Sequence, residues 1–388
     1  MISFNKPSHI VITCSKRMSP YLQKEVTELG FKLKSVFQTG VELNGTLNDC
    51  IRLNMNLRCA SQILYSLKSF KCNGPDELYK VISEVQWETM IEKTGRFSVT
   101  STINHPSITN SLFANVKVKD AIVDRFREKT GERPDSGSGI ENAVIHLFWR
   151  EDSAEIFLDT SGDTLAKHGY RRIPGAAPMM ESLAAATLLA TKWDHRSAFI
   201  NPMCGSSTIA IEAASLATNR RPGLYRDNYA FMHILGYDHE FYQAEKTKLK
   251  DQIVNRPDVR IIASDISQDA INISRINAGA AGVEEMIEFE VCDFEETDIP
   301  ASPGVVYFNP EYGERLGEEI ELEKTYKRIG DFLKQKCKGY TGYIFTGNLH
   351  LAKKIGLKAS RKIEFYTGKI DCRLLEYELY VGTKTSST

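Results

Sequence analysis

Short apolar runs alternate with helical stretches throughout the second half of this 388-residue chain, and this regularity most limits the folds that it can adopt. Such an alternation is typical of a doubly wound, mostly parallel α/β sheet with helices on both faces. We expect strands at residues 197–200, 260–264, 287–291, 304–308 and 342–345, and helices at residues 181–191, 207–217 and 268–280. Residues 362–366 and 374–380 predict a final hairpin, which makes one strand antiparallel.

Four consecutive predicted strands end in a polar residue, namely Asn201, Asp265, Asp293 and Asn309. The carboxyl ends of parallel strands meet at one edge of the sheet, and doubly wound folds bind their ligands there. Each residue alone is also explained as the cap of a following helix, and this alternative stays open. Four such ends in succession favour a ligand site at this edge.

The turn after the first of these strands has the sequence NPMCGSST, from Asn201 to Thr208. Its small residues let a ligand approach the backbone, and the helix that follows favours a negative group at its N-terminus. The turn is neither GxGxxG nor a P-loop, which argues against NAD and nucleoside triphosphates. Asp265 is placed to accept hydrogen bonds from a ribose diol and Asp293 from an adenine amine. A carboxylate, a ribose and an adenine together describe S-adenosylmethionine.

The fourth strand end continues as Asn309-Pro310-Glu311-Tyr312. An exocyclic amine of a nucleobase is a poor nucleophile because its lone pair is delocalised into the ring. The Asn309 side-chain carbonyl and the Pro310 backbone carbonyl are two acceptors that would hold its hydrogens and aim the nitrogen at a methyl group. Tyr312 would stack on the base. An ordinary Asn-Pro turn with a packed tyrosine is the competing interpretation.

The first half of the chain predicts smaller α+β units. A short strand at residues 9–13 and a helix closed by Gly30 begin the first unit, which ends near residue 45. Beyond it, Asp76 is a candidate N-cap, residues 116–129 form a periodic helix, and residues 142–149 and 153–159 predict a hairpin.

Charge gives no support for binding nucleic acid through the chain as a whole. Lys plus Arg number 49 against 50 Asp plus Glu, for a net charge of −1, so a nucleic acid must bind a local patch. The tightest basic cluster lies between the two halves of the chain, where a nucleic-acid strand would cross to the methyl donor, and consists of Lys167, His168, Arg171 and Arg172. On the helix at 116–129, Lys117, Lys119, Arg125 and Arg127 fit a solvated face as well as an RNA contact.

Several other classes of protein or site are disfavoured. No apolar run of about 18 residues exists to span a membrane, and no apolar signal core follows the N-terminus. The eight cysteines form no CxxC pair, so a reducing cytoplasm fits best. We expect no metal, because His233 and His239 lack a third ligand, and no nucleophilic role for Cys204, which has no histidine partner in the sequence.

The chain resembles the RlmL-like large-subunit ribosomal RNA guanine-N2 methyltransferases, also labelled adenine-specific DNA methylases, over nearly its whole length. The resemblance rests on Asn110-Ser111 with residues 116–124, on the HGYR segment from His168 to Arg171 with APMMESLAAA after it, on NPMCGSST followed by IEAA, and on NPEYGERL at residues 309–316. It implies a Rossmann-like class I methyltransferase sheet of seven strands behind a ferredoxin-like and THUMP region. The implied domains are a ferredoxin-like part at 1–45, a THUMP domain at 46–162, a linker with the first helix at 163–195 and a methyltransferase domain at 196–384.

The resemblance also implies site residues, a cofactor and a partner. Catalysis falls to Asn309, Pro310 and Tyr312. S-adenosylmethionine is bound by Asn201, Met203, Gly205, Ser206, Ser207, Thr208, Asp265, Ile266, Asp293, Phe294 and Asn309. Ribosomal RNA of the large subunit is contacted by Lys117, Lys119, Lys167, His168, Arg171 and Arg172. The oligomeric state stays open between a monomer and a weak dimer.

Three residues depart from the family pattern. Ser207 stands where the family has glycine, Asn201 replaces an acidic residue, and Glu311 replaces the second proline. A β-carbon at Ser207 is costly if the turn needs a positive φ there. These departures keep two alternatives open beside an RNA methyltransferase: an RNA-binding protein with a degenerate cofactor pocket, and a DNA adenine-N6 methyltransferase.

Overall fold

The computed structural model describes residues 2–105, 108, 110–175, 178–312 and 316–381 and divides into two compact units. Unit 1 contains Met1–Cys14, Leu22–Leu165 and Pro222–Lys248, and unit 2 contains Ser15–Tyr21, Ala166–Arg221 and Leu249–Thr388. Residues 222–248 therefore belong with unit 1, although they lie inside the expected methyltransferase range of 196–384. Backbone hydrogen bonds hold this segment, from Phe231 N–H to the Thr160 carbonyl (3.1 Å) and from Leu235 N–H to the Met90 carbonyl (2.8 Å).

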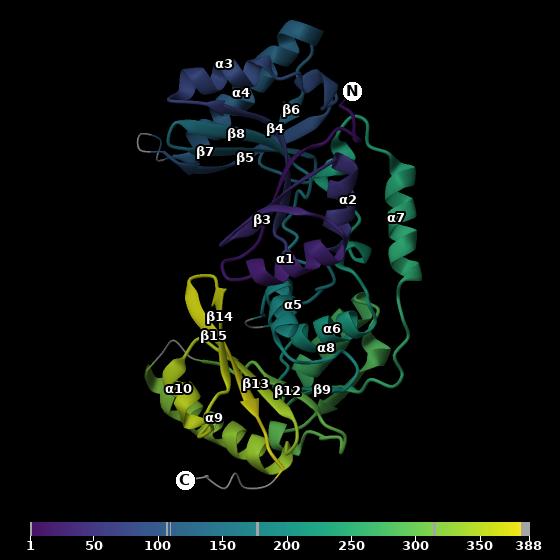
Figure 1. Ribbon diagram of the computed structural model, residues 1–388, viewed down its shortest axis with the longest axis vertical. Helices are drawn as coiled ribbons and strands as arrows, with labels where there is room; N and C mark the ends of the chain where they lie inside the picture. Colours follow the sequence, from purple (N-terminus) through teal and green to yellow (C-terminus); the bar gives the residue numbers. More distant parts are fainter. Residues whose placement is uncertain (1, 106–107, 109, 176–177, 313–315, 382–388) are drawn as a thin grey trace. The chain divides into compact units, whose positions relative to one another are not determined.

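Unit 2 is built on the seven-stranded sheet that the alternation predicts (Figure 1). The strands in spatial order are β11 (Ile287–Val291), β10 (Ile261–Asp265), β9 (Ala198–Pro202), β12 (Gly304–Phe308), β13 (Thr341–Thr346), β15 (Ile370–Glu378) and β14 (Arg361–Thr367). The pairs from β11 to β13 are parallel, and β15 is antiparallel to both of its neighbours. The expected mostly parallel sheet with a terminal hairpin is confirmed.

The sheet reverses its order at β9. The chain passes from β9 to β10 on one side, and β12 returns on the other side of β9. A crevice forms at the carboxyl ends of the strands at such a switch point, which is where open α/β sheets bind ligands. The ends of β9, β10 and β12, at Pro202, Asp265 and Phe308, are therefore brought together as the sequence predicts.

Helices cover both faces of this sheet (Figure 1). One core forms where α9 (Leu316–Lys336) and α10 (Leu349–Lys354) pack against alternate strand residues, such as Ile200, Val306 and Ile344. The other face is covered by α5 (Glu181–Ala190), α6 (Thr208–Ala217) and α8 (Gln268–Ala280). Burial of strands on both faces explains why they read as continuous apolar runs rather than as an alternation.

Unit 1 contains one eight-stranded sheet, mostly antiparallel. Its strands in spatial order are β2 (Leu33–Phe37), β3 (Gly40–Gly45), β1 (Ser8–Thr13), β4 (Gln62–Lys71), β8 (Ser153–Asp159), β7 (Ala143–Arg150), β5 (Arg96–Asn104) and β6 (Asp135–Ser136). The long strand β4 joins the two predicted parts, because its first residues pair with β1 and its remainder with β8. The predicted hairpin at 142–159 is confirmed as β7 and β8.

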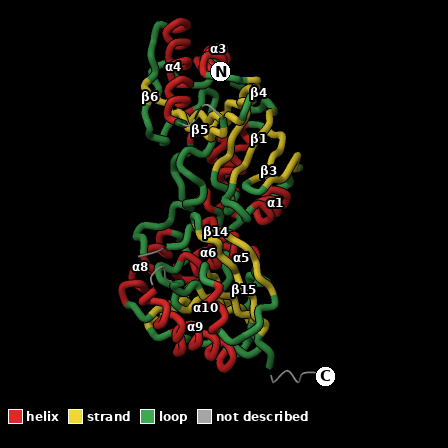
Figure 2. The backbone as a smooth tube through the Cα atoms, turned by 90° about the vertical axis from the view of Figure 1, so that its left-hand side faces the viewer, coloured by secondary structure: helices red, strands yellow, loops and turns green. Residues whose placement is uncertain are grey.

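The helices that lie wholly in unit 1 are α2 (Leu47–Asn56), α3 (Pro75–Glu84) and α4 (Ser111–Thr130), and those that lie partly in it are α1 (Ser19–Glu28) and α7 (His239–Asp251). Helices α3 and α4 lie side by side (Figures 1 and 2). The prediction that Asp76 caps α3 is wrong, because Gly74 is the N-cap and Pro75 begins the helix, which leaves Asp76 in the first turn. Among the helices in the described ranges, none combines the length and apolar character needed to cross a membrane.

Candidate cofactor and substrate site

A cavity of about 600 Å³ lies at the carboxyl ends of β9, β10 and β12 in unit 2. Nine of the residues proposed from the sequence line it, namely Asn201, Met203, Gly205, Ser206, Thr208, Asp265, Ile266, Asn309 and Pro310. A volume of this size matches pockets that bind a cofactor or small ligand. The cavity is open, and the buried side chain of Ser207 is not part of its lining.

The turn after β9 owes its shape to three residues with left-handed backbone conformations. Met203, Gly205 and Ser207 have φ values of 54°, 56° and 57°. The turn is closed by hydrogen bonds from Cys204 N–H to the Ser264 carbonyl (2.9 Å) and from Ser207 N–H to the Cys204 carbonyl (2.8 Å). Ser207 is the N-cap of α6, so the position does require the positive φ that glycine adopts most easily.

Asp265 joins the end of β10 to this turn. Its Oδ2 accepts a hydrogen bond from Gly205 N–H at 2.9 Å, and its Oδ1 accepts one from Ser267 N–H at 3.0 Å. A carboxylate has about four acceptor positions, so two remain for a ligand diol. The next side chain, Ile266, is 74% exposed and lines the cavity, where it offers an apolar surface to a planar ring.

Asn201 presents an acceptor to the cavity. Its Nδ2 donates to the Tyr307 carbonyl at 2.9 Å, which fixes the orientation of the amide. Its Oδ1 is buried and has no hydrogen-bond partner within the described part of the chain. A buried acceptor without a partner is unfavourable by about 1–3 kcal/mol, and a ligand ammonium group would satisfy it. The residues of the cavity thus fit the charged amino-acid end of S-adenosylmethionine.

Asn309, Pro310 and Glu311 follow β12 and line the same cavity. The Glu311 side chain is exposed and makes no hydrogen bond or ion pair with the residues that the structure describes. Tyr312 does not line the cavity. Its ring lies beside Gly347, where an added Cβ would come within 3.1 Å, and its carbonyl is 3.5 Å from Asn348 Nδ2. Residues 313–315 of the predicted motif lie outside the described ranges.

Asp293 and Phe294 do not reach the cavity lining. Asp293 Oδ1 accepts hydrogen bonds from Glu295 N–H (3.0 Å) and from Arg328 of α9 (2.8 Å). Burial alone would raise the pKa of Asp293, but these hydrogen bonds and the Arg328 charge together lower it below its usual value. The Phe294 ring packs edge-on against Phe308 and Phe332 in the core, and the cofactor contacts expected of Asp293 and Phe294 stay predictions.

The basic cluster of the HGYR segment divides into inward and outward residues. His168 is 1% exposed and its Nδ1 lies 2.7 Å from Glu212 Oε1 of α6, so the prediction that it contacts RNA is wrong. Arg171 is also turned inward: its Nη2 donates to the Met179 carbonyl (2.6 Å) and lies 3.1 Å from Thr208 Oγ1, and its Nε is 3.2 Å from Glu181. These contacts hold the turn at the cavity. Lys167 and Arg172 are exposed.

The basic residues of α4 lie close to acidic ones. Lys117 is 3.9 Å from Asp76 and Lys119 is 3.9 Å from Asp120, distances at which exposed ion pairs contribute little. Arg125 differs, because its guanidinium forms two hydrogen bonds to Glu88 (2.6 and 2.7 Å) and its side chain is only 11% exposed. Lys117 and Lys119 therefore stay candidates for RNA contact, whereas Arg125 is committed to the packing of α4.

The sequence makes Cys204 a candidate nucleophile, and His233 and His239 candidate metal ligands. Burial raises the pKa of the Cys204 thiol to about 12, so it stays protonated and unreactive near pH 7. His233 and His239 are exposed. In the described part of the chain no cluster of three or more His, Cys, Asp or Glu side chains is arranged to hold a metal ion.

A seven-stranded sheet with one antiparallel strand, and a cofactor-sized cavity at its switch point, define the class of Rossmann-like methyltransferases. The chain belongs to the RMKL-like methyltransferase family: the model of that methyltransferase domain matches residues 168–376. The RlmL ferredoxin-like domain matches residues 9–64 and the THUMP domain residues 73–159. The resemblance inferred from the sequence is therefore confirmed, and S-adenosylmethionine is the cofactor of this family.

Similar proteins include ribosomal RNA large subunit methyltransferases K/L. That of Syntrophotalea carbinolica is 34% identical over 383 residues, 96% of this chain and 54% of the relative, and that of Psychromonas ingrahamii is 36% identical over 375 residues, 95% and 50%. The chain thus spans about half the length of these relatives.

Solved structures agree with this assignment. SMU.472, a methyltransferase complexed with SAH, has a TM-score of 0.87 at 25% identity, with 97% of this chain and all of that chain covered. A predicted N6-adenine-specific DNA methylase from Listeria monocytogenes has a TM-score of 0.86 at 28% identity, covering 96% and 97%. Both likenesses extend over nearly the whole chain.

Proposed function

We propose that this protein is an S-adenosylmethionine-dependent RNA methyltransferase that modifies the exocyclic N2 amine of a guanine in large-subunit ribosomal RNA. One observation carries the proposal: Asn309 and Pro310 line the same cavity as the turn at residues 203–208 and Asp265. The groups that would hold an amine and the groups that would hold a cofactor thus share one space. As an enzyme of ribosomal RNA, it would act in the cytoplasm.

Different cavity residues suit different groups of the cofactor. The Asn201 Oδ1 acceptor suits the ammonium group, and the N-terminus of α6 suits the carboxylate. Asp265 suits the ribose diol, and Ile266 suits one face of the adenine. When bound, the cofactor supplies an electrophilic methyl group.

Asn309 and Pro310 orient the substrate amine. Their two carbonyl oxygens accept its two hydrogens and lower the energy of the positive charge that develops on nitrogen. The amine nitrogen that Asn309 and Pro310 hold would accept the methyl group that the bound cofactor would supply, and it would then release one proton to water. Guanine reaches this position only when unpaired or turned out of a helix.

Glu311 favours guanine over adenine as the base. Its carboxylate lines the cavity next to the two acceptors and has no partner in the described structure. Guanine carries two donors side by side, the N1–H and the N2 amine, so a third acceptor beside the amine matches it. Adenine has an N1 lone pair beside its N6 amine, which a carboxylate repels. The residue that departs from the family pattern therefore supports the N2 target.

Methyl transfer to two polymers tests the proposal. Tritium from labelled S-adenosylmethionine should appear in deproteinised large-subunit ribosomal RNA and not in duplex DNA, and mass spectrometry of the digested RNA should give N2-methylguanosine. Tritium in DNA adenine would instead support an adenine-N6 activity, for which the similar protein from Listeria monocytogenes is named.

Calorimetry distinguishes the enzyme from the remaining alternative, an RNA-binding protein with a degenerate cofactor pocket. Because the cavity is of cofactor size and Asn201 Oδ1, which has no partner among the described residues, suits the ammonium group, S-adenosylmethionine should bind with micromolar affinity. Binding of RNA with no detectable binding of the cofactor would overturn the enzyme in favour of an RNA-binding protein of the same fold.

A further inference from the structure

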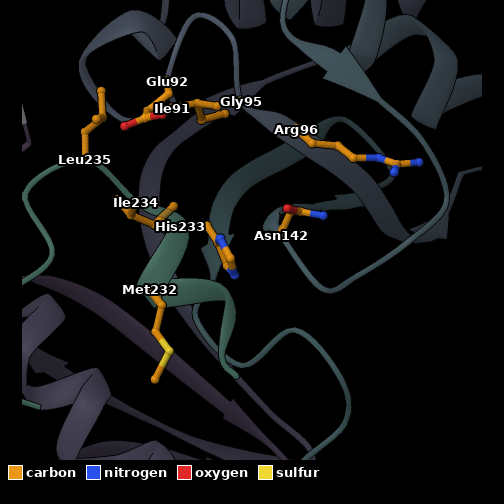
Figure 3. Close-up of a pocket in the computed structure, with 9 residues that line it drawn as sticks. All are labelled: Ile91, Glu92, Gly95, Arg96, Asn142, Met232, His233, Ile234 and Leu235. Carbon is orange, nitrogen blue, oxygen red and sulfur yellow. The ribbon is translucent and has the colours of Figure 1, made fainter. Parts of the chain in front are cut away.

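A second cavity, of about 330 Å³, lies within unit 1 (Figure 3). Its lining consists of Ile91, Glu92, Gly95, Arg96, Asn142, Met232, His233, Ile234 and Leu235. The volume is at the lower end of the range of about 300–1,000 Å³ for small-molecule pockets, so it has room for about one nucleotide.

Segments that are distant in the sequence build this cavity. Gly95 and Arg96 lie at the start of β5, Asn142 precedes β7, and residues 232–235 come from the segment that unit 1 receives from the second half of the chain. The hydrogen bonds from Leu235 N–H to the Met90 carbonyl (2.8 Å) and from Phe231 N–H to the Thr160 carbonyl (3.1 Å) hold that last segment in place. The cavity wall is therefore formed before any ligand arrives, which reduces the entropy lost on binding.

The polar side chains of Arg96, Asn142 and His233 lie on one side of the cavity, and Glu92 lies on the other (Figure 3). The Arg96 side chain is 52% exposed, and its Nε is 3.6 Å from Asp135, too long for a strong ion pair. The amide of Asn142 has no hydrogen-bond partner in the described ranges. His233 Nε2 lies 2.8 Å from Asn228 Oδ1; if Nε2–H donates there, Nδ1 is left as an acceptor. Partial burial lowers the pKa of His233, which keeps the ring neutral near pH 7.

The chemistry of this set matches one nucleotide. A guanidinium pairs with a phosphate, and an amide and a neutral imidazole offer donors and acceptors to a base edge or a ribose hydroxyl. Gly137 leaves space for the guanidinium, because a Cβ there would lie 2.7 Å from Arg96 Nη2. Arg96 and Asn142 both fall within the THUMP match at residues 73–159.

We propose that this cavity binds a single unpaired nucleotide of the substrate RNA, with Arg96 on its phosphate and Asn142 and His233 on its base or ribose edge. The inference rests on the proposed function only in that the ligand is RNA. It gives the segment at 222–248 a role: although it interrupts the methyltransferase sequence, it completes a substrate pocket in unit 1.

Filter binding of in vitro transcribed large-subunit ribosomal RNA to the full chain tests the site. R96A and N142A should each weaken the affinity about 10-fold, and R96A should lower the salt dependence by about one phosphate contact. R150A is the matched control, because Arg150 is an exposed arginine at the opposite end of β7, and its variant should change the affinity less than about twofold. Cofactor affinity, measured by calorimetry, should not change in any of the three.

Photo-crosslinking locates the RNA independently. RNA transcribed with 4-thiouridine should crosslink to the peptide that contains Met232 and His233 in the parent protein, and R96A should reduce the yield. Equal RNA affinity of R96A, N142A and R150A, or crosslinks that exclude residues 91–96, 142 and 232–235, would overturn the site. A parent protein that binds RNA in this way and transfers no methyl group would refute the proposed function and leave this inference standing.

Discussion

The two cavities of this protein are assembled in different ways. The cavity of unit 2 takes most of its walls from short motifs at the ends of strands β9, β10 and β12, whereas that of unit 1 combines residues near 95, 142 and 233. Parallel strands bring their carboxyl ends together whatever the details of the loops, so local motifs suffice to locate the first cavity. The second depends on where one long excursion of the chain packs, which no local pattern encodes.

The strand-end residue Asn309 should show the largest effect. N309A removes one acceptor for the substrate amine, so kcat for methyl transfer should fall about 10²- to 10³-fold, while the Kd for S-adenosylmethionine stays within about threefold. N309D keeps an acceptor oxygen and should recover part of the activity. Single-turnover transfer and calorimetry measure the two quantities. If N309A were as active as the parent protein, the motif at Asn309 and Pro310 would have no role in catalysis.

Glu311 tests whether one residue of a local motif selects the base. After the methylated position is mapped, RNA fragments with guanosine or 2-aminopurine riboside there are compared, because 2-aminopurine keeps the N2 amine and lacks the N1–H. The parent should prefer guanosine, and E311P should reduce this preference about 10-fold, since a good base contact discriminates by about 1–3 kcal/mol. An unchanged preference in E311P would show that Glu311 does not contact the base edge.

Tertiary packing decides the role of Arg171, a residue of the HGYR segment. R171K keeps the charge but cannot hold Met179, Thr208 and Glu181 with one planar fork, so the affinity for S-adenosylmethionine should fall about 10-fold. R172K is the control, because the neighbouring Arg172 is exposed, and it should leave cofactor binding unchanged. If R171K instead weakens RNA binding alone, the sequence-based assignment of Arg171 to RNA is restored.

Two buried groups of unit 1 should make its stability respond to pH in opposite directions. Burial raises the pKa of Asp159 to about 6, so the folded state holds a proton that the unfolded state has lost, and this group destabilises unit 1 as the pH rises from about 4 to 6. Burial lowers the pKa of His146 to about 4, so this group stabilises unit 1 as the pH rises from about 4 to 6.5. In the parent protein the two contributions oppose each other.

Replacing Asp159 or His146 makes the effect of the other group on the pH dependence of stability visible. In D159N, the urea midpoint of unit 1 should rise more steeply between pH 4 and 6.5 than in the parent, by a difference of about 1–3 kcal/mol in the free energy of unfolding. H146Q should change the slope in the reverse direction. Parallel pH profiles of the parent and both variants would mean that neither group titrates on unfolding.

The turn at Ser207 should show the smallest effect. S207G removes the β-carbon from a residue with φ 57° and should raise the stability of unit 2 by about 1 kcal/mol, seen as a higher urea midpoint. S206G, in the same turn but without a positive φ, should lower it slightly. Equal shifts in the two variants would show that backbone strain at Ser207 does not contribute.

Much of unit 2 could be predicted because its signals are local. The apolar runs located the parallel strands, and the polar residues after three of them line one cavity. Asp293 and Phe294 also follow a strand, yet they do not line this cavity. Arg328 of α9 pairs with Asp293, and the core receives the Phe294 ring. A sequence pattern shows that a residue ends a strand, but not which distant side chain will compete for it.

The amino-acid sequence by itself determined the strands of the sheet and the residue types at their carboxyl ends, because hydrophobic periodicity and turn chemistry act over a few residues. Only the tertiary structure decided that His168 and Arg171 point inward and that residues 222–248 join unit 1. A basic residue favours solvent unless a buried carboxylate such as Glu212 or Glu181 compensates its charge, and such partners lie 10 to 44 positions away along the chain. Folding brings these partners together, and composition and spacing do not record it.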